Sequence, residues 1–220
     1  NDDVWHNIGI RSISDEKTFP KQTKESYKIN KPNLYFESID EKKLRVYNSC
    51  LQVENEMRVV TAGADRYACN IFIDRSKNIG IYNTTLLRSY GMGVIAQLTE
   101  NIEVDSLTVK AREDVLFSLN ADATHFVHCK GMVKVTNCSF SEQRDDALNI
   151  HGVFTKVITK TDEYIIVKYM HKQAKGLNIY QKNSEFSIVS PKTMIAKGKY
   201  KIDDVEVLNK NYTKIYVSGD

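Results

Sequence analysis

Three aspartates, Asp122, Asp145 and Asp146, are the side chains whose type and spacing suggest chemistry. Asp122 precedes the apolar Phe126 by four residues. Asp146 precedes Ile150 by the same interval, so the two acids hold equivalent places in successive repeats. Neighbouring strands lie ~4.8 Å apart, which predicts that these carboxylates are close together, with Asp145 beside them and pointing another way. Crowded like charges favour one protonated carboxyl beside ionised ones, which is the division of roles that glycoside hydrolysis needs.

Five polar side chains on these repeats are expected to bind sugar hydroxyls: Gln97, His125, Arg144, Asn149 and His151. There are structural alternatives, since adjacent aspartates at a turn often bond local backbone amides and histidines are often satisfied parts of a fold. A calcium site built from Asp122, Asp145 and Asp146 is a further alternative, because clustered carboxylates bind hard cations. No regular acidic spacing repeats along the chain, so no metal site is assigned.

A repeat between Cys69 and Val157 provides the elements that position these residues. In each copy a second apolar position follows the first by seven residues, and a third short segment follows the second. The first positions are Phe72, Ile95, Phe126 and Ile150, and the second are Ile79, Ile102 and Val133, with Val157 continuing the series. Three short strands in a unit of roughly two dozen residues predict a right-handed parallel β-helix over about 62–157, with these positions in two interior columns.

Loops of varying length join one repeat to the next and carry the acids. They span 88–93, 111–124 and 142–147. Stacked repeats place such loops along one edge, and function is usually carried on loops held by a rigid scaffold. Asn78, Asn101 and Gly131 recur in phase between the first and second strands, where a left-handed backbone suits Asn or Gly. An antiparallel sandwich is the alternative fold, and the lack of Asn-Gly or Asp-Gly hairpin turns in this segment disfavours it.

The parts of the chain on either side of the repeat differ from it. Residues 1–61, which include a Lys-rich stretch at 15–31, are expected to form an incomplete flanking β element. Residues 62–152 are predicted to hold the coils with the active site. Residues 153–220 alternate apolar and polar side chains in short runs, which predicts a small antiparallel β-barrel or sandwich. The expected runs are 163–169, 185–189, 200–207 and 213–217. The whole chain is therefore predicted to be all-β.

Composition excludes several classes of protein. Of 220 residues, 41% are hydrophobic and 27% are charged, so the chain is expected to fold around a core rather than stay disordered. The net charge is only +3 and the basic residues are scattered, so no nucleic-acid partner is indicated. No apolar run approaches the ~20 residues of a membrane-spanning helix. The four cysteines lack zinc-ligand spacing. Two disulfides and four buried thiols are both open, and buried thiols are favoured because a domain of this size does not need disulfides.

Two runs of residues closely resemble glycoside hydrolase family 110, the bacterial α-1,3-galactosidases. They are 120–126 (NADATHF) and 143–152 (QRDDALNIHG). Residues 90–97 (YGMGVIAQ) look like the coil that precedes this motif in the family, and 169–176 (YMHKQAKG) are similar to its segment where a small β-barrel is inserted. Members of the family are considerably longer and the chain begins at Asn1, so it is expected to be an excerpt of a longer protein.

The resemblance implies a secreted or periplasmic bacterial exo-enzyme that removes terminal α-1,3-linked galactose, as on blood group B glycans, with inversion and without a cofactor. It implies that the candidate acids are Asp122, Asp145 and Asp146, and it leaves open which is the acid and which the base. Asp145 or Asp146 is favoured as half of the working pair. In an inverting enzyme that pair is expected ~6.5–9.5 Å apart, so that a water fits between them.

Two alternatives come from different classes of protein. Polygalacturonases of family 28 are also β-helices and carry an Asn-x-Asp followed by an Asp-Asp pair, which 120–122 and 145–146 match. The chain lacks their Gly-His-Gly and later Arg-x-Lys, and has His151 and Gly152 close behind the Asp pair instead, which disfavours pectin as a substrate. The other alternative is a non-catalytic β-helix that binds carbohydrate or calcium through these acids.

Overall fold

The computed structural model describes residues 68–113, 115 and 117–218, together with four short earlier segments at 8–12, 35–41, 43–47 and 57–61. The strands in those segments are β1 (Ile8–Ser12), β2 (Tyr35–Asp40), β3 (Lys43–Tyr47) and β4 (Met57–Thr61). β1 pairs antiparallel with β4, and β2 with β3. The Lys-rich stretch at 15–31 and Cys50 lie outside the described residues.

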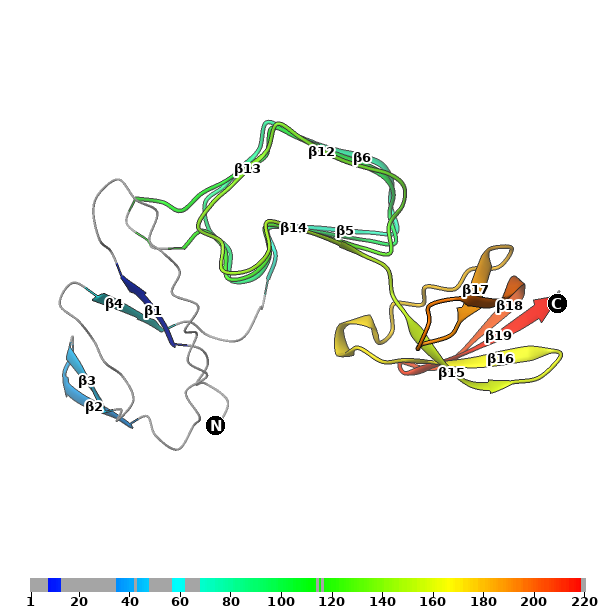
Figure 1. Ribbon diagram of the computed structural model, residues 1–220. Helices are drawn as coiled ribbons and strands as arrows, with labels where there is room; N and C mark the ends of the chain where they lie inside the picture. Colours follow the sequence, from blue (N-terminus) through cyan, green and yellow to red (C-terminus); the bar gives the residue numbers. More distant parts are fainter. Residues whose placement is uncertain are drawn as a thin grey trace.

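The chain from β5 to β14 passes through three parallel sheets in a fixed order, and Figure 1 looks along the stack so that the successive passes overlie one another. The first sheet contains β5 (Ile71–Asp74), β8 (Val94–Gln97), β11 (Thr124–Val127) and β14 (Leu148–His151). The second contains β6 (Lys77–Tyr82), β9 (Glu100–Asp105) and β12 (Lys130–Thr136), and the third β7 (Thr85–Leu86), β10 (Thr108–Val109) and β13 (Ser139–Phe140). The predicted parallel pairing of successive repeats is therefore confirmed.

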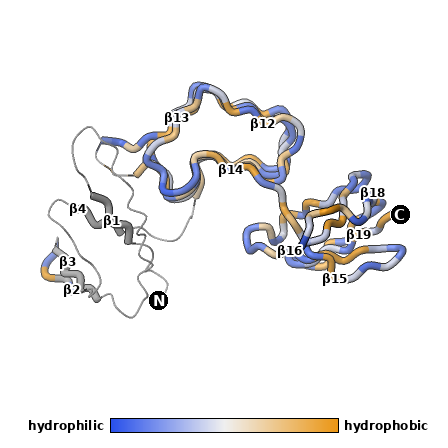
Figure 2. Tube along the Cα trace, in the orientation of Figure 1, coloured by the Kyte–Doolittle hydropathy of each residue, from blue (hydrophilic) through white to orange (hydrophobic). Residues whose placement is uncertain are grey.

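The interior of the stack is a continuous apolar core. In the second sheet Ile79 pairs with Ile102 and Ile102 with Val133, as the spacing predicts. The outer faces of the same strands carry charged side chains, among them Glu103, which bonds Lys134. Hydrophobic and hydrophilic residues consequently alternate around each pass, as Figure 2 shows.

The predicted first column is wrong by one residue at its start. Phe72 pairs with Ile95, and Ile95 pairs with His125 rather than with Phe126. Phe126 is completely buried, whereas 58% of Phe72 is exposed. The residues that share the interior position are Ile73, Ala96, Phe126 and Ile150. Ile150 is nevertheless 53% exposed, because β14 is the last strand of this sheet among the described residues. Because side chains alternate between the two faces of a strand, a slip of one residue turns each of them to the other face.

An extra residue in the third pass explains the slip. The register shifts between Lys130 and Val133, so that β12 holds two residues, Gly131 and Met132, where β9 holds Asn101 alone. The interior positions of the first and second strands are therefore seven residues apart in this pass and six in the other two. A constant spacing of seven aligns the third pass correctly and shifts the first two by one residue.

The corners between strands have left-handed backbone at equivalent places. Asn78, Asn101 and Gly131 have φ values of 56°, 57° and 69°, which confirms the predicted turn residues. Asn101 donates from Nδ2 to Asn78 Oδ1 at 3.1 Å, and its own Oδ1 accepts from the Met132 N–H at 2.9 Å. A Cβ on Gly131 would lie 2.3 Å from Asn101 Oδ1, so a larger residue here would displace the amide that accepts from the Met132 N–H.

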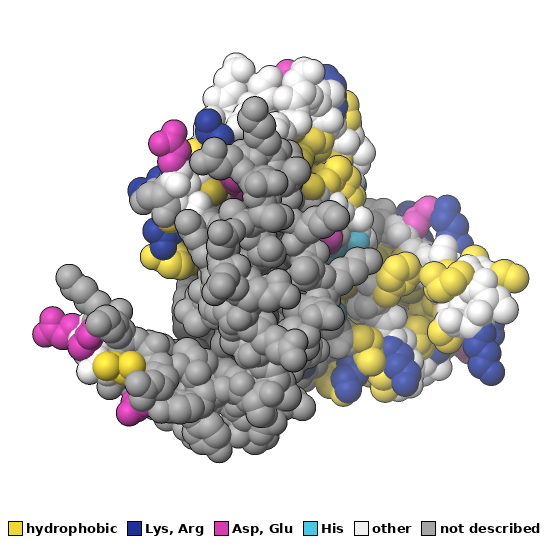
Figure 3. Space-filling model, turned by 60° about the vertical axis from the view of Figure 1, so that its left-hand side comes forward, with side chains coloured by type: hydrophobic (Ala, Val, Ile, Leu, Met, Phe, Trp, Pro, Cys, Tyr) yellow, Lys and Arg dark blue, Asp and Glu magenta, His cyan; other side chains and the backbone are white. Residues whose placement is uncertain are grey.

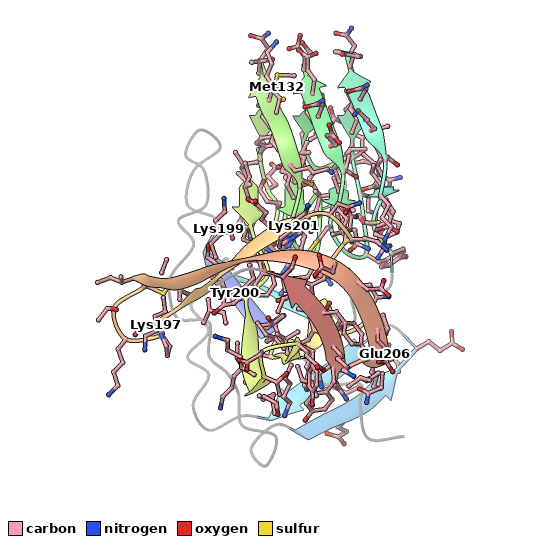
Figure 4. The ribbon with its side chains drawn as sticks, turned by 90° about the vertical axis from the view of Figure 1, so that its right-hand side faces the viewer. Met132, Lys197, Lys199, Tyr200, Lys201 and Glu206 are labelled. Atoms are coloured by element: carbon pink, nitrogen blue, oxygen red, sulfur yellow. The ribbon has the colours of Figure 1, made fainter. Side chains whose placement is uncertain are left out.

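The chain then enters one antiparallel sheet of five strands. Their order is β15 (Thr155–Lys160), β16 (Tyr164–Tyr169), β19 (Tyr212–Ser218), β18 (Ala196–Asn209) and β17 (Glu185–Val189). Figure 4 shows the long, curved β18, along which Tyr200 is buried between the exposed Lys199 and Lys201. The predicted antiparallel module is confirmed as a curved sheet, in which β15 and β17 are the two edges among the described strands. The prediction that Val157 continues the parallel repeat is wrong, because Val157 lies in β15 and pairs antiparallel with Val167.

A second apolar cluster joins this sheet to the stacked strands. Leu98 and Val127, at one corner of the stack, pack against Tyr169, Leu177 and Ile179. The segment that follows β16 contains the single short 3-10 helix η2 (Lys172–Ala174), which lies over this contact. Every other regular element in the described part is a strand, so the all-β prediction is confirmed. Cys69, Cys129 and Cys138 are partly buried free thiols.

In the described residues no helix is long and apolar enough to cross a membrane.

Candidate active site

The outward face of the first parallel sheet forms the floor of the candidate site. One row across this face holds Phe72, Ile95, His125 and Asn149, which are paired residues on β5, β8, β11 and β14. The next row holds Asp74, Gln97, Val127 and His151. Four of the five predicted sugar-binding residues therefore lie on two neighbouring rows of one surface.

Backbone hydrogen bonds fix Asp122 and Asp146 in equivalent positions at the edge of this floor. The Gly93 N–H donates to the Asp122 carbonyl at 2.9 Å, and the Ala123 N–H donates to the Asp146 carbonyl at 2.8 Å. A Cβ on Gly93 would lie 2.4 Å from the Ala123 carbonyl oxygen, so glycine lets its loop stack closely on the loop that carries Asp122. The predicted equivalence of the two aspartates is confirmed.

The three aspartates form one cluster. One carboxylate oxygen from each of Asp122, Asp145 and Asp146 lies within 4.8 Å of the other two. Asp122 is buried and the other two are exposed. The Asn149 amide joins two of them, donating to Asp122 Oδ2 at 3.5 Å and to Asp146 Oδ2 at 3.4 Å. These nearest oxygens are closer together than the ~6.5–9.5 Å expected between the working carboxyls of an inverting enzyme.

Two histidines extend the cluster along the floor. His125 Nδ1 lies 2.5 Å from Asp122 Oδ2, and His125 Nε2 lies 2.9 Å from His151 Nε2. The two rings meet edge to face, with centroids 4.9 Å apart. The backbone N–H of a third histidine, His128, donates to the His151 carbonyl at 2.8 Å. The partly buried His128 ring accepts from the Val153 N–H at 3.4 Å, and burial lowers the pKa of this imidazole. The predicted site histidines thus contact each other and an acid.

A cavity of about 620 Å³ lies above this floor, within the ~300–1,000 Å³ typical of ligand sites. All three aspartates line it, as do His125, His151, Asn149 and Gln97. The segment after β16 forms the opposite wall through Met170, His171 and Gln173. A larger cavity of about 1430 Å³ lies between β14 and the antiparallel sheet, and none of the three acids lines it. Figure 3 shows an acidic and a histidine side chain beside hydrophobic ones near the centre of the molecule.

Arg144 lies outside the set of residues that line the cavity. Its guanidinium donates to Asn120 Oδ1 at 2.5 Å and stacks over the Phe117 ring at 5.3 Å. Both partners belong to the loop that carries Asp122, so Arg144 braces that loop against its neighbour. Gln97 lines the cavity and donates from Nε2 to Asp74 Oδ1 at 3.0 Å.

Sequence reasoning did not identify the apolar part of the cavity. Phe72 and Ile95 line the floor, and Leu177 contributes to the opposite wall. Phe72 and Ile95 stand in the same row as His125 and Asn149, so the correct register would have marked them as outward-facing residues of the site. The error in the first column and this omission have the same cause.

The acid cluster offers few ligands to a metal ion. Calcium takes six to eight oxygens, and the cluster supplies one carboxylate from each of three residues. Asp122 Oδ2 is already engaged by His125. The arrangement suits proton transfer better than closed coordination, because one buried and two exposed carboxyls lie side by side at the wall of an open cavity.

Known proteins share both parts of the chain. The family described as GLAA-B beta-barrel domain II matches residues 164–220, which hold β16 to β19. Alpha-1,3-galactosidase B of Phocaeicola vulgatus is 34% identical over 154 residues, which is 68% of this chain and 26% of that protein. Alpha-1,3-galactosidase A of Bacteroides fragilis is 31% identical over 68% of the chain and 25% of its own length. Alpha-1,3-galactosidase A of Akkermansia muciniphila is 32% identical over 66% of this chain and 25% of its own length.

The matched part of the chain spans about a quarter of the length of these relatives. A stretch that covers about two thirds of 220 residues must include the middle of the chain, where the three aspartates lie. The similarity therefore extends across the candidate site and is not confined to the antiparallel sheet.

Proposed function

We propose that the chain is part of an α-1,3-galactosidase of glycoside hydrolase family 110, which removes a terminal α-1,3-linked galactose from a glycan. The observation that carries this proposal is the cluster of Asp122, Asp145 and Asp146 at the wall of one cavity. Relatives named alpha-1,3-galactosidase support the choice of galactose. We further propose that the three parallel sheets belong to a right-handed parallel β-helix, with residues 62–152 as its site-bearing coils and 153–220 as a barrel-type module.

The carboxyls divide the chemistry between them. Cleavage of a glycosidic bond needs one carboxylic acid to protonate the leaving oxygen and one carboxylate to act as base or nucleophile. Asp145 and Asp146 are exposed and so accessible to substrate and water. Asp122 is buried and engaged by His125 and Asn149, which suits it to orient water or a sugar hydroxyl. Gln97 and Asn149 lie where sugar hydroxyls would meet the floor.

The stereochemistry of the product is the experiment that tests this proposal. We propose hydrolysis with inversion, which requires Asp145 or Asp146 to move outward so that a water fits between the working pair. Proton NMR of the sugar released from an α-1,3-galactoside is expected to show β-galactose first and α-galactose only after mutarotation. α-Galactose appearing first would contradict inversion and would fit the short separation of the carboxylates, since retaining pairs are ~5–5.5 Å apart.

A calcium-binding module is the second candidate, because clustered carboxylates are ligands of hard cations. If hydrolysis is the function, addition of millimolar calcium is expected to leave the melting temperature of the protein unchanged within error. A calcium-dependent rise that Asp145→Asn abolishes, together with no release of galactose, would favour the binding module instead.

We also propose a secreted or periplasmic location and blood group B-type glycans as substrates. Both follow from the family resemblance, and neither proposal depends on a cofactor. The competing pectin substrate is distinguishable by assay, since a polygalacturonase releases uronic acid from a polymer whereas the proposed enzyme releases galactose from a chain end.

A further inference from the structure

His125 and His151 form a continuous chain of short contacts with Asp122. The contacts are Asp122 Oδ2 to His125 Nδ1 at 2.5 Å, His125 Nε2 to His151 Nε2 at 2.9 Å, and His151 Nδ1 to the Gly152 carbonyl oxygen at 2.8 Å. All four ring nitrogens are therefore engaged. In this arrangement neither imidazole has a nitrogen left for a sugar hydroxyl, so a role other than sugar binding is needed for the pair.

The hydrogen-bonded series Asp122–His125–His151 requires one proton more than two neutral imidazoles carry. Each of its three contacts needs one proton, and the Gly152 carbonyl at one end can only accept. Two neutral imidazoles supply two protons, and an ionised Asp122 supplies none. The third proton makes one imidazole cationic or sits on the Asp122 carboxyl. Either way the three groups together have no net charge, and this count does not depend on the tautomer of either ring.

This hydrogen-bonded series leads from the buried Asp122 to the cavity. Asp122 is 3% exposed and His125 8% exposed, whereas His151 is exposed and lines the cavity. Protons therefore exchange with solvent at the His151 end. Loss of the additional proton leaves one of the three contacts without hydrogen, so two lone pairs face each other at hydrogen-bond distance.

The charged surroundings favour retention of this proton. Asp145 and Asp146 lie within 4.8 Å of an Asp122 oxygen, from the loop before β14. Asp74 lies in the same row of the floor as His151, and Arg75 pairs with it. His171 faces the chain across the cavity. Most of the charges that face the pair are negative, and negative charges stabilise an imidazolium.

We propose that His125 and His151 are positioning residues that hold one shared additional proton, which cancels the charge of Asp122 and fixes its carboxyl beside Asp145 and Asp146. The proton count rests on the geometry alone, and the role in hydrolysis rests on the proposed function. Under this arrangement Asp145 and Asp146 carry the net charge of the cluster and exchange protons with substrate. Deprotonation at high pH frees the Asp122 charge and loosens the site.

Nitrogen-15 NMR of the full chain tests the shared proton directly. The chain has five histidines, so labelled imidazole nitrogens give a simple spectrum that single His→Gln variants assign. The signals of His125 and His151 are expected to change together in one single-proton step as the pH rises. In Asp122→Asn the amide can donate to His125 Nδ1, so two neutral imidazoles fill the remaining contacts and a further proton makes the three groups cationic; the step is therefore expected to move about one pH unit or more toward acid.

Matched variants make this test decisive. Asp162→Asn, in the exposed turn between β15 and β16, is expected to leave the step in place. In His151→Gln the amide can donate to His125 Nε2 without an additional proton, so the step of the remaining His125 signal is expected to move about one pH unit or more toward acid. Two independent histidine steps in the wild type, or a step that Asp122→Asn does not move, would overturn the proposal.

Kinetics test the role in hydrolysis. The alkaline limb of the kcat/KM profile is expected to coincide with the NMR step in the wild type and to shift by about one pH unit or more in His151→Gln. Asp162→Asn, which lies outside the cavity, is expected to leave the limb in place. A uniform loss of rate with an unchanged profile in His151→Gln would reduce the pair to a structural role and overturn this part. Absence of galactoside turnover in the wild type refutes the proposed function, whereas the shared proton is refuted only by NMR.

Discussion

Replacement of Asp146 by asparagine is expected to lower the turnover of an α-1,3-galactoside by at least ~10²-fold with only a modest change in galactose binding. Asparagine has the shape of the carboxyl but cannot take up or release a proton. Its oxygen can still accept the hydrogen bond that Asn149 donates to Asp146 at 3.4 Å, so the loop keeps this contact. Asp145→Asn is expected to have a similar effect. Separate measurement of kcat and KM provides the check, because a loss confined to proton transfer appears in kcat.

The control for this experiment is an aspartate of similar exposure away from the site. Asp162→Asn is expected to change kcat by less than about twofold, since Asp162 lies in the turn between β15 and β16. Full activity in both the Asp145 and the Asp146 variants would remove these residues from the proposed mechanism. Asp122→Asn is also expected to damage activity, but through the histidine pair that it binds, so its pH profile should change shape as well as height.

Phe126→Ala is expected to cost ~3–5 kcal/mol in the free energy of unfolding. Phe126 is fully buried and shares its interior position with the small Ala96 on one side and Ile150 on the other. Removal of the ring leaves a cavity that its neighbours cannot fill, because Ala96 has no side chain long enough to reach into it. Urea unfolding followed by circular dichroism measures the change as a lower midpoint with an unchanged slope.

Phe72→Ala is the matched control for the stability measurement. Phe72 occupies a strand of the same sheet but points outward, with 58% of its surface exposed, so its truncation is expected to cost less than about 1 kcal/mol. Equal losses in the two variants would restore the single interior column and contradict the register described above. A large loss confined to Phe126 would support it.

The sequence predicts the strands well because their pattern depends on local alternation. The second column, the third strands and the turn residues Asn78 and Asn101 all follow from spacing within one repeat. The first column does not, because the extra residue at Gly131 exists only relative to the partner strand β9. A single chain read along its length shows seven residues between two apolar positions and cannot show which one lacks a partner.

The site is predictable to the extent that it depends on register alone. Asp122 and Asp146 come together because β11 and β14 pair without a slip, so equal distances from Phe126 and Ile150 are sufficient. The hydrogen-bonded series from Asp122 through His125 to His151 depends on the side-chain conformations of the two imidazole rings, which lie on neighbouring strands. Sequence spacing places both rings on one surface but carries no information about which nitrogen of one faces which nitrogen of the other.

The corner at Gly131 and the long loop before β11 show how such a scaffold tolerates change in length. The interior residues Ala96 and Phe126 are 30 positions apart, whereas Ile73 and Ala96 are 23 apart, yet all three stack in register. The loop before β11 absorbs seven additional residues and the corner at Gly131 absorbs one, whereas a slip of one residue in the pairing of a strand would exchange core and surface. Natural variation can therefore lengthen the loop that carries Asp122 and reshape the cavity without changing the core.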